Sequence, residues 1–235
     1  QVIGLVVYPI LTRIYSPEDF GLLNLFLSIG GVLTILATAE YYNAIVLPKK
    51  ESESISVVHV CVCLLLLMVG LIGITVCFSH EIATIFKSPK LADYYWMMPI
   101  LVFVLGGWNI LNYWYIRCAR YDSVSAYQLS QSILSAGGKL GFGYAGQLSG
   151  GMIYSTVLAP ALSLLISLLR SRKIIANLAT FSWTKTIETA RKYRNLPFYS
   201  LPRSFINMLA GQLPVLLLTP VFGSKYVGWW SMALL

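Results

Sequence analysis

Three basic side chains fall within or beside long apolar stretches. Lys139 follows Ala136-Gly137-Gly138, Arg203 lies about five residues into an apolar run, and Arg13 lies at the end of another. A charge at the centre of a bilayer costs at least about 2.5 kcal/mol, so such groups usually face protein or water. Arginine also suits phosphate, because its planar donors bind two oxygens at once. Asn207 lies one helical turn after Arg203, so the pair predicts a stripe that faces a cavity.

Each of these cations has a second interpretation. Arg13 could extend to the membrane interface or pair with Glu18 or Asp19, and Arg203 could extend to the inner interface. Lys139 needs a partner, a wet cavity or a lipid phosphate, because close helix packing explains its glycine neighbours but not a lysine. The sequence leaves both interpretations open for each residue.

Glu40 is the one acid in such a stretch. It could bind a coupling proton or sodium ion, or it could form an ion pair with a nearby cation. Since Lys139 and Arg203 outnumber it, the charges within the apolar runs favour an anionic substrate. Glycine-rich phosphate loops, nucleophile triads and metal-ligand spacings are absent from the sequence. We therefore predict no enzyme, no metal and no cofactor.

The overall composition is that of a membrane protein. Only 11% of the 235 residues are charged and 57% are hydrophobic, whereas a soluble domain carries about 25% charged residues. This excludes an ordinary soluble enzyme, a disordered chain and a disulfide scaffold. The net charge of +8 fits the basic bias of cytoplasmic membrane loops better than nucleic-acid binding.

Charge-free runs of about 20 residues recur along the chain, and each is long enough to cross a bilayer. Ser16-Pro17 offers a helix start, with a capping side chain and a first-turn proline. We predict an all-α polytopic membrane protein with spans near 1–15, 18–47, 56–79, 90–116, 126–147, 151–170 and 198–221, and an eighth span opening near Gly228. Residues 1–170 would form a six-helix transmembrane lobe, 171–197 a linker, and 198–235 the start of a second lobe.

Lysine and arginine number 11 in the loops after even-numbered spans and 4 in the others. The positive-inside rule then places the former loops, and the N-terminus, in the cytoplasm. In the linker, Ser182 could cap a helix that runs through Arg194, with Trp183 and Ile187 on one broad side. Such a helix would either lie on the anionic inner leaflet or act as a solvated connector between two bundles.

A weak internal repeat relates the two ends of the chain. Residues 11–25 align without a gap on residues 218–232, so Gly21 meets Gly228 at an offset of 207 residues. Both segments join the end of one predicted span to the start of the next. Because six spans separate the copies, they have the same orientation, as in transporters built from two parallel halves. We expect the chain to be an N-terminal fragment whose second half continues beyond residue 235.

Several motifs resemble a known family, the Wzx-like oligosaccharide flippases of polysaccharide biosynthesis. This family shares a superfamily with the lipid II flippase and the MATE drug exporters. The motifs are PILTRIYSPEDFGLLNLFLSI at 9–29, NAIVLPKKESES at 43–54, ARKYRNLPFYSLP at 190–202 and AGQLPVLLLTPVFGSKYVG at 210–228. In one departure, the acid of a basic-aromatic-acidic pattern before AIVLP is displaced by two residues, to Glu40.

The resemblance implies a flippase in the bacterial cytoplasmic membrane. It would move undecaprenyl-pyrophosphate-linked oligosaccharide repeat units, for O-antigen, capsule or exopolysaccharide, to the outer leaflet by alternating access driven by a proton or sodium gradient. A polysaccharide polymerase and assembly proteins would be its partners, beside membrane lipids. Arg13, Lys139, Arg203 and Asn207 would then contact the diphosphate in the cavity, and Glu40 is the candidate for ion coupling.

Two other functions stay open. A MATE-like ion-coupled drug antiporter would share the fold, but an exporter of cationic drugs would favour acids in its cavity. A membrane enzyme of polysaccharide assembly would need a large periplasmic loop or a carboxylate cluster, and the predicted outer loops are short and contain neither.

Overall fold

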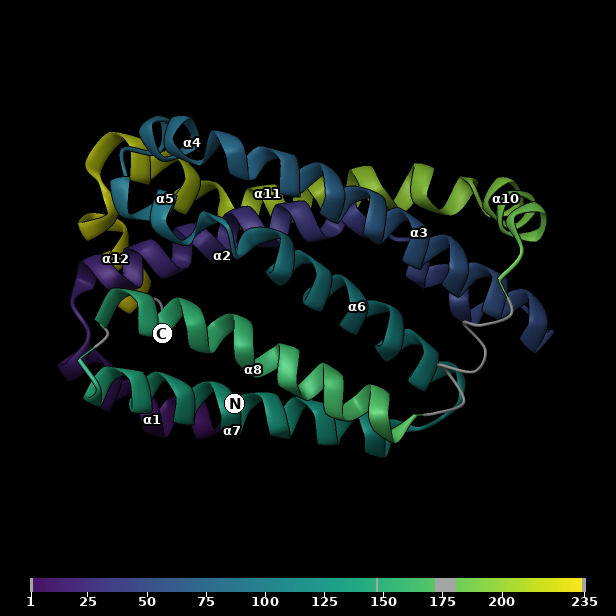
Figure 1. The fold of residues 1–235 in the computed structure, drawn as a ribbon, viewed down its shortest axis with the longest axis horizontal. Coiled ribbons are helices and arrows are strands. Elements are labelled where there is room, and N and C mark those ends of the chain that lie inside the picture. Colours follow the sequence, from purple (N-terminus) through teal and green to yellow (C-terminus); the bar gives the residue numbers. More distant parts are fainter. Residues whose placement is uncertain (1, 147, 172–180, 234–235) are drawn as a thin grey trace.

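The chain forms a bundle of helices. The computed structural model describes residues 2–146, 148–171 and 181–233, and within these ranges every regular element is helical (Figure 1). In chain order the helices are α1 (Val2–Ile14), α2 (Pro17–Thr38), η1 (Tyr41–Val46), α3 (Glu51–Thr75), η2 (Val76–Phe78), α4 (Ser79–Ile85), α5 (Pro89–Tyr95), α6 (Met98–Arg117), α7 (Tyr121–Tyr144), α8 (Leu148–Arg170), α10 (Trp183–Lys192), α11 (Asn195–Phe222) and α12 (Ser224–Ala233).

Helix α2 is the centre of the bundle. It begins with the predicted cap, since the Ser16 hydroxyl accepts a hydrogen bond from the Asp19 amide and the Asp19 carboxylate accepts one from the Ser16 amide. Its first turns are buried at Phe20, Leu22 and Leu25. Helices α3, α6, α8, α11 and α12 all pack against it. Because lipid is as apolar as these side chains, close van der Waals packing against α2 is what holds the helices together in a bilayer.

Among the described residues, five helices are long and apolar enough to cross a membrane, which confirms the predicted class of all-α polytopic membrane protein. They cover Pro17–Thr38, Glu51–Ile85, Met98–Arg117, Gly150–Arg170 and Asn195–Phe222. Two predicted spans are not among them. Helix α1 has only 13 residues, and α7 carries a row of polar side chains that lowers its hydropathy.

Two predicted spans are interrupted. The span near 18–47 is wrong in its second part, because α2 ends at Thr38 and both Ala39 (φ 44°) and Glu40 (φ 58°) adopt left-handed backbone. The span near 90–116 is two helices, α5 and α6, separated at Trp96 and Met97. Left-handed backbone is rare outside glycine, so nothing in the residue types at 39 and 40 signals the break.

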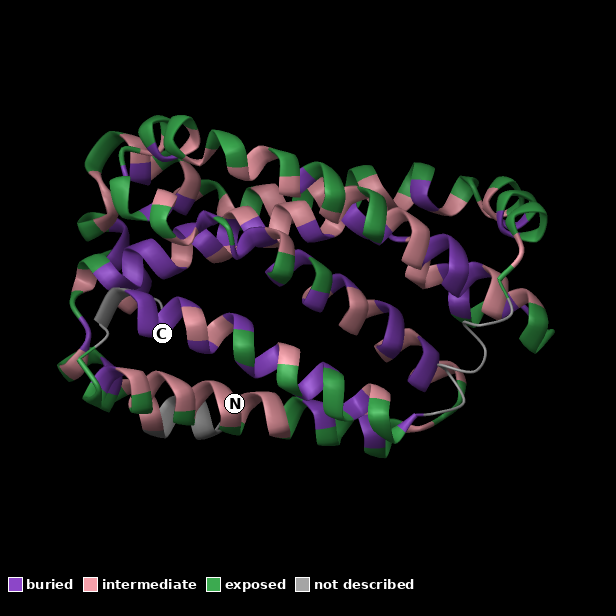
Figure 2. Ribbon diagram, in the orientation of Figure 1, coloured by how far each residue is buried: buried purple, intermediate pink, exposed green. Residues whose placement is uncertain are grey.

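Helix α10 lies in the predicted linker and packs on α3, but it ends at Lys192 and the Ser182 side chain makes no capping hydrogen bond to it. Thr186 and Thr189 are its buried positions, whereas the side chains of Trp183 and Ile187 stay exposed. The bundle therefore buries the threonine side of α10 and leaves its apolar side outside. Figure 2 shows the same contrast across the molecule, with buried positions along α2 and exposed ones along α4 and α10.

Candidate functional site

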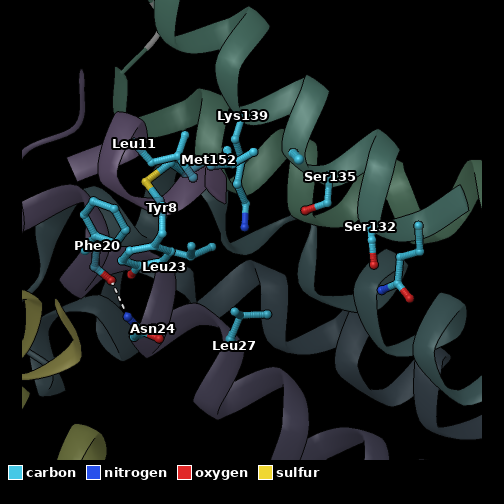
Figure 3. A pocket seen from close by; sticks show the side chains of 13 residues that line it. Tyr8, Leu11, Phe20, Leu23, Asn24, Leu27, Ser132, Ser135, Lys139 and Met152 are labelled. Carbon is cyan, nitrogen blue, oxygen red and sulfur yellow. Dashed lines mark hydrogen bonds between the residues drawn. The ribbon is translucent and has the colours of Figure 1, made fainter. Parts of the chain in front are cut away.

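A cavity of about 490 Å³ lies between α1, α2 and α7 (Figure 3). Its apolar wall comes from α1 and α2. The wall residues are Val7, Tyr8, Leu11, Phe20, Leu23 and Leu27. The Tyr8 and Phe20 rings lie 5.5 Å apart between centroids, and Asn24 adds an amide that donates to the Phe20 carbonyl at 2.9 Å.

Helix α7 supplies the polar side of this cavity. Ser132, Ser135 and Lys139 all line it, and their spacing of three and four residues places them on one face of the helix. The Lys139 side chain extends from α7 into the cavity (Figure 3). It is the only charged side chain among the described residues that line the cavity. Nor does its ammonium group form an ion pair with another described residue.

Close packing on both sides of α7 sets the direction of Lys139. A Cβ on Gly138 would lie 2.8 Å from Cβ of Ser155, so α7 and α8 approach closely there. The Tyr15 hydroxyl donates to the Lys139 carbonyl oxygen at 2.5 Å. A Cβ on Gly143 would lie 3.1 Å from the same hydroxyl. These contacts fix the last turns of α7 against α1 and α8, which leaves the Lys139 side chain directed to the cavity.

Sequence reasoning missed several of these residues. Tyr15 carries no local signal, and only the tertiary contact with Lys139 gives it a role. Tyr8 and Asn24 come from two other helices, so no local pattern connects them to Lys139. The serines Ser132 and Ser135 did carry a signal, because they share a helical face with Lys139.

The other predicted cations lie elsewhere. Arg13 is exposed in the last turn of α1 and is not among the described residues that line the cavity. Its suggested partner Glu18 pairs instead with Lys90, at 3.1 Å between Nζ and Oε1. Arg203 lines a separate hollow with Tyr199 and Ser200 on α11. In the described part of the chain, Arg13, Lys139 and Arg203 therefore do not share one cavity.

Arg203 and Asn207 both face outward from α11. Both residues are exposed, and only 11% of the 18-residue apolar segment of this helix is buried. Helix α11 packs on α2 along one side. A cavity contact for Arg203 and Asn207 stays a prediction.

Glu40 is buried, with 6% of its surface exposed. The Tyr42 hydroxyl donates to its Oε1 at 3.1 Å, and the Asn43 amide donates to its Oε2 at 3.2 Å. Across the residues that the structure describes, these donors are neutral and no ion pair involves Glu40. The arrangement satisfies a carboxylate at the junction of α2 and η1. Its part in ion coupling stays a prediction.

A comparison with family models bears directly on identity. The family model described as polysaccharide biosynthesis protein matches residues 10–234, nearly the whole chain. The chain belongs to this family. No curated protein and no solved structure matches it significantly. Membership confirms the resemblance to the Wzx-like flippases and links the chain to polysaccharide biosynthesis. Among the described residues, no group of three His, Cys, Asp or Glu side chains could hold a metal ion.

Proposed function

We propose that the protein is a flippase for undecaprenyl-pyrophosphate-linked oligosaccharide repeat units in the bacterial cytoplasmic membrane. The observation that carries the proposal is the cavity between α1, α2 and α7, in which Lys139 is the one charge among the described lining residues, on a wall of apolar and neutral polar groups. The family supports a part in polysaccharide biosynthesis. Five membrane-length helices in the described part of the chain support a substrate that moves within a bilayer.

The parts of such a substrate match the parts of this cavity. A diphosphate is anionic, and an ammonium group in surroundings of low dielectric attracts it more strongly than in water. Ser132, Ser135 and Asn24 offer neutral hydrogen-bonding groups, which suit sugar hydroxyls. Tyr8 and Leu27 offer apolar surface beside them. We assign the diphosphate to Lys139 and the first sugar to the serine row of α7.

The remaining predicted residues fit a later position of the substrate. Arg203 and Asn207 are exposed on α11, and a second lobe would cover that side of the helix. Arg13 is exposed at the end of α1. We propose that the three side chains contact the diphosphate as the two lobes rearrange, and that Glu40 carries the coupling proton or sodium ion.

Charge distinguishes this proposal from its rivals. An exporter of organic cations needs acidic side chains in its cavity, and no described acidic residue lines the cavity around Lys139. An enzyme of polysaccharide assembly would need a cluster of carboxylates. The adjacent acids Glu18 and Asp19, at the start of α2, serve in an ion pair and a helix cap.

Polysaccharide export in living cells tests the proposal. Cells that lack the native gene receive the intact protein as wild type, Lys139→Ala or the control Lys225→Ala, whose lysine is exposed on α12. We expect Lys139→Ala to abolish surface polysaccharide and cause lipid-linked repeat units to accumulate in the inner leaflet, at normal protein levels. Lys225→Ala should export normally. Normal export by Lys139→Ala would refute the assignment.

A further inference from the structure

A second cavity, of about 580 Å³, lies between the first turns of α3 and helix α10. Both elements lie at the opposite end of the bundle from α12 (Figure 1). Its basic lining residues are Lys50, Lys185, Lys192 and His59. Its acidic lining residues are Glu53 and Glu188. None of these residues lines the cavity around Lys139. The second cavity is therefore a separate polar site formed by the linker helix and α3.

The charges around this cavity leave one positive charge in excess. Lys192 and Glu53 form a hydrogen-bonded ion pair, and the hydrogen bond to Glu53 raises the pKa of the Lys192 ammonium group. Lys50 and Lys185 form no ion pair with a described residue, and Glu188 balances only one of them. Lys50 also occupies the N-cap of the 25-residue helix α3, where unpaired amide groups favour an anion.

His59 is a second, independent sign of a ligand. It lines the cavity, the residue is only 5% exposed, and its Nε2 atom has no hydrogen-bond partner among the described residues. The Phe181 ring packs edge-on against it at 5.3 Å between centroids. A buried polar atom without a partner destabilises the folded protein. His59 borders the cavity, so a polar ligand seated there would lie beside this unpartnered group.

The position of the cavity is that of lipid headgroups. The charge-free run of α3 begins at Ser54, directly beside the cavity. Farther along α3, Leu66, Leu67 and Ile74 are exposed, as expected where a helix faces acyl chains. On the other side, α10 exposes Trp183, a residue typical of the membrane interface. The cavity therefore lies where the apolar part of the bundle ends.

From these observations we infer that the cavity between α3 and α10 binds the phosphate headgroup of an anionic membrane phospholipid. The single excess positive charge matches a phosphodiester monoanion, such as that of phosphatidylglycerol, better than a diphosphate. Lys50 and Lys185 contact the phosphate, and Ser52 and Ser56 hydrogen-bond the hydroxyls of the headgroup. The bound lipid ties α10 to α3 and so holds the linker against the first helices.

Native mass spectrometry of the intact protein tests this inference. The protein in neutral detergent is titrated with phosphatidylglycerol or with phosphatidylcholine, which lacks a net charge. We expect the wild type to retain phosphatidylglycerol at least about tenfold more strongly, which corresponds to about 1.4 kcal/mol. The double variant Lys50→Gln/Lys185→Gln should lose this preference, whereas Lys50→Arg/Lys185→Arg should keep it. Lys225→Gln changes an exposed lysine of α12, at the other end of the bundle (Figure 1), and should behave as wild type.

Two outcomes would overturn the inference. The first is an unchanged lipid preference in the double glutamine variant with an unchanged melting temperature. The second is displacement of phosphatidylglycerol by millimolar inorganic phosphate, which would show a site for a soluble anion rather than for a lipid. Neither outcome depends on export, so the inference is tested separately from the proposed flippase activity.

Discussion

Gly21 of α2 and Gly228 of α12 lie at the crossing of the two helices, where each glycine approaches a backbone carbonyl of the other helix. A Cβ on Gly21 would lie 1.8 Å from the carbonyl oxygen of Ser224, and a Cβ on Gly228 would lie 1.6 Å from that of Pro17. Both Gly21 and Gly228, and Pro17 and Ser224, are 207 residues apart. Reciprocal contacts of this kind are typical of two-fold interfaces. They support the proposal that α2 and α12 are equivalent helices of two repeated lobes.

This crossing should not tolerate a methyl group. We expect Gly228→Ala in the intact protein to separate α2 from α12, at a cost of at least about 1–3 kcal/mol. A thermal melt should show a lower melting temperature than wild type. Gly70→Ala is the matched control, because Gly70 is also helical and a Cβ there would meet no side chain and no neighbouring helix within 4 Å. Equal melting temperatures for the two variants would contradict the close packing at Gly228.

Tyr15 should stabilise the end of α7 through its hydroxyl. Tyr15→Phe removes the hydrogen bond to the Lys139 carbonyl oxygen while keeping the ring. We expect a loss of about 0.5–1.5 kcal/mol in the free energy of unfolding. Tyr144→Phe removes the hydroxyl of a tyrosine that is 78% exposed, and its melting temperature should equal that of wild type. If both variants melt alike, the Tyr15 hydroxyl contributes nothing.

Much of the fold follows from the sequence. The capping side chain of Ser16 predicted the start of α2, and the charge-free runs predicted the membrane character of most long helices, because both features act locally. The break at Ala39 and Glu40 was not predictable, since neither residue is a glycine and yet both adopt left-handed backbone. Helix α7 was predicted as a span although it contains Lys139, and its row of polar side chains keeps it outside the set of helices apolar enough to cross a membrane.

The candidate site was only partly predictable. The cost of a charge in an apolar run singled out Lys139, and the structure places it in a cavity. Its neighbours could not be predicted, because Tyr8 and Phe20 reach the same space only when α1 and α2 pack beside α7. The same cost singled out Arg203, yet the side chain of this residue lies on the outside of α11.

Exposure separates a transport role of Arg203 from a structural one. Because the side chain is exposed, Arg203→Ala should change the free energy of unfolding by no more than about 0.5 kcal/mol. We nevertheless expect it to reduce export of surface polysaccharide at normal protein levels. Arg13→Ala should likewise leave the free energy of unfolding nearly unchanged and reduce export. Full export by both variants would exclude these residues from the substrate path, while the control Lys225→Ala should export normally.

Glu40 should matter for energy coupling more than for folding. Glu40→Gln keeps the size of the side chain and an oxygen that can accept from Tyr42 or Asn43, but it cannot exchange a proton. In proteoliposomes, we expect transport of a lipid-linked oligosaccharide by this variant to respond weakly to an imposed proton or sodium gradient. The control Glu18→Gln alters an exposed ion pair and should respond as wild type. An unchanged response in Glu40→Gln would remove it from coupling.

The affinity of the intact protein for undecaprenyl pyrophosphate tests most directly whether Lys139 binds the diphosphate. A hydrogen bond to a charged group contributes about 1.5–3 kcal/mol, so Lys139→Ala should bind this lipid at least about tenfold more weakly than wild type. Lys139→Arg should keep most of the affinity, and uncharged undecaprenol should bind all three proteins alike. Equal affinity of wild type and a folded Lys139→Ala for the pyrophosphate would contradict a diphosphate site at Lys139.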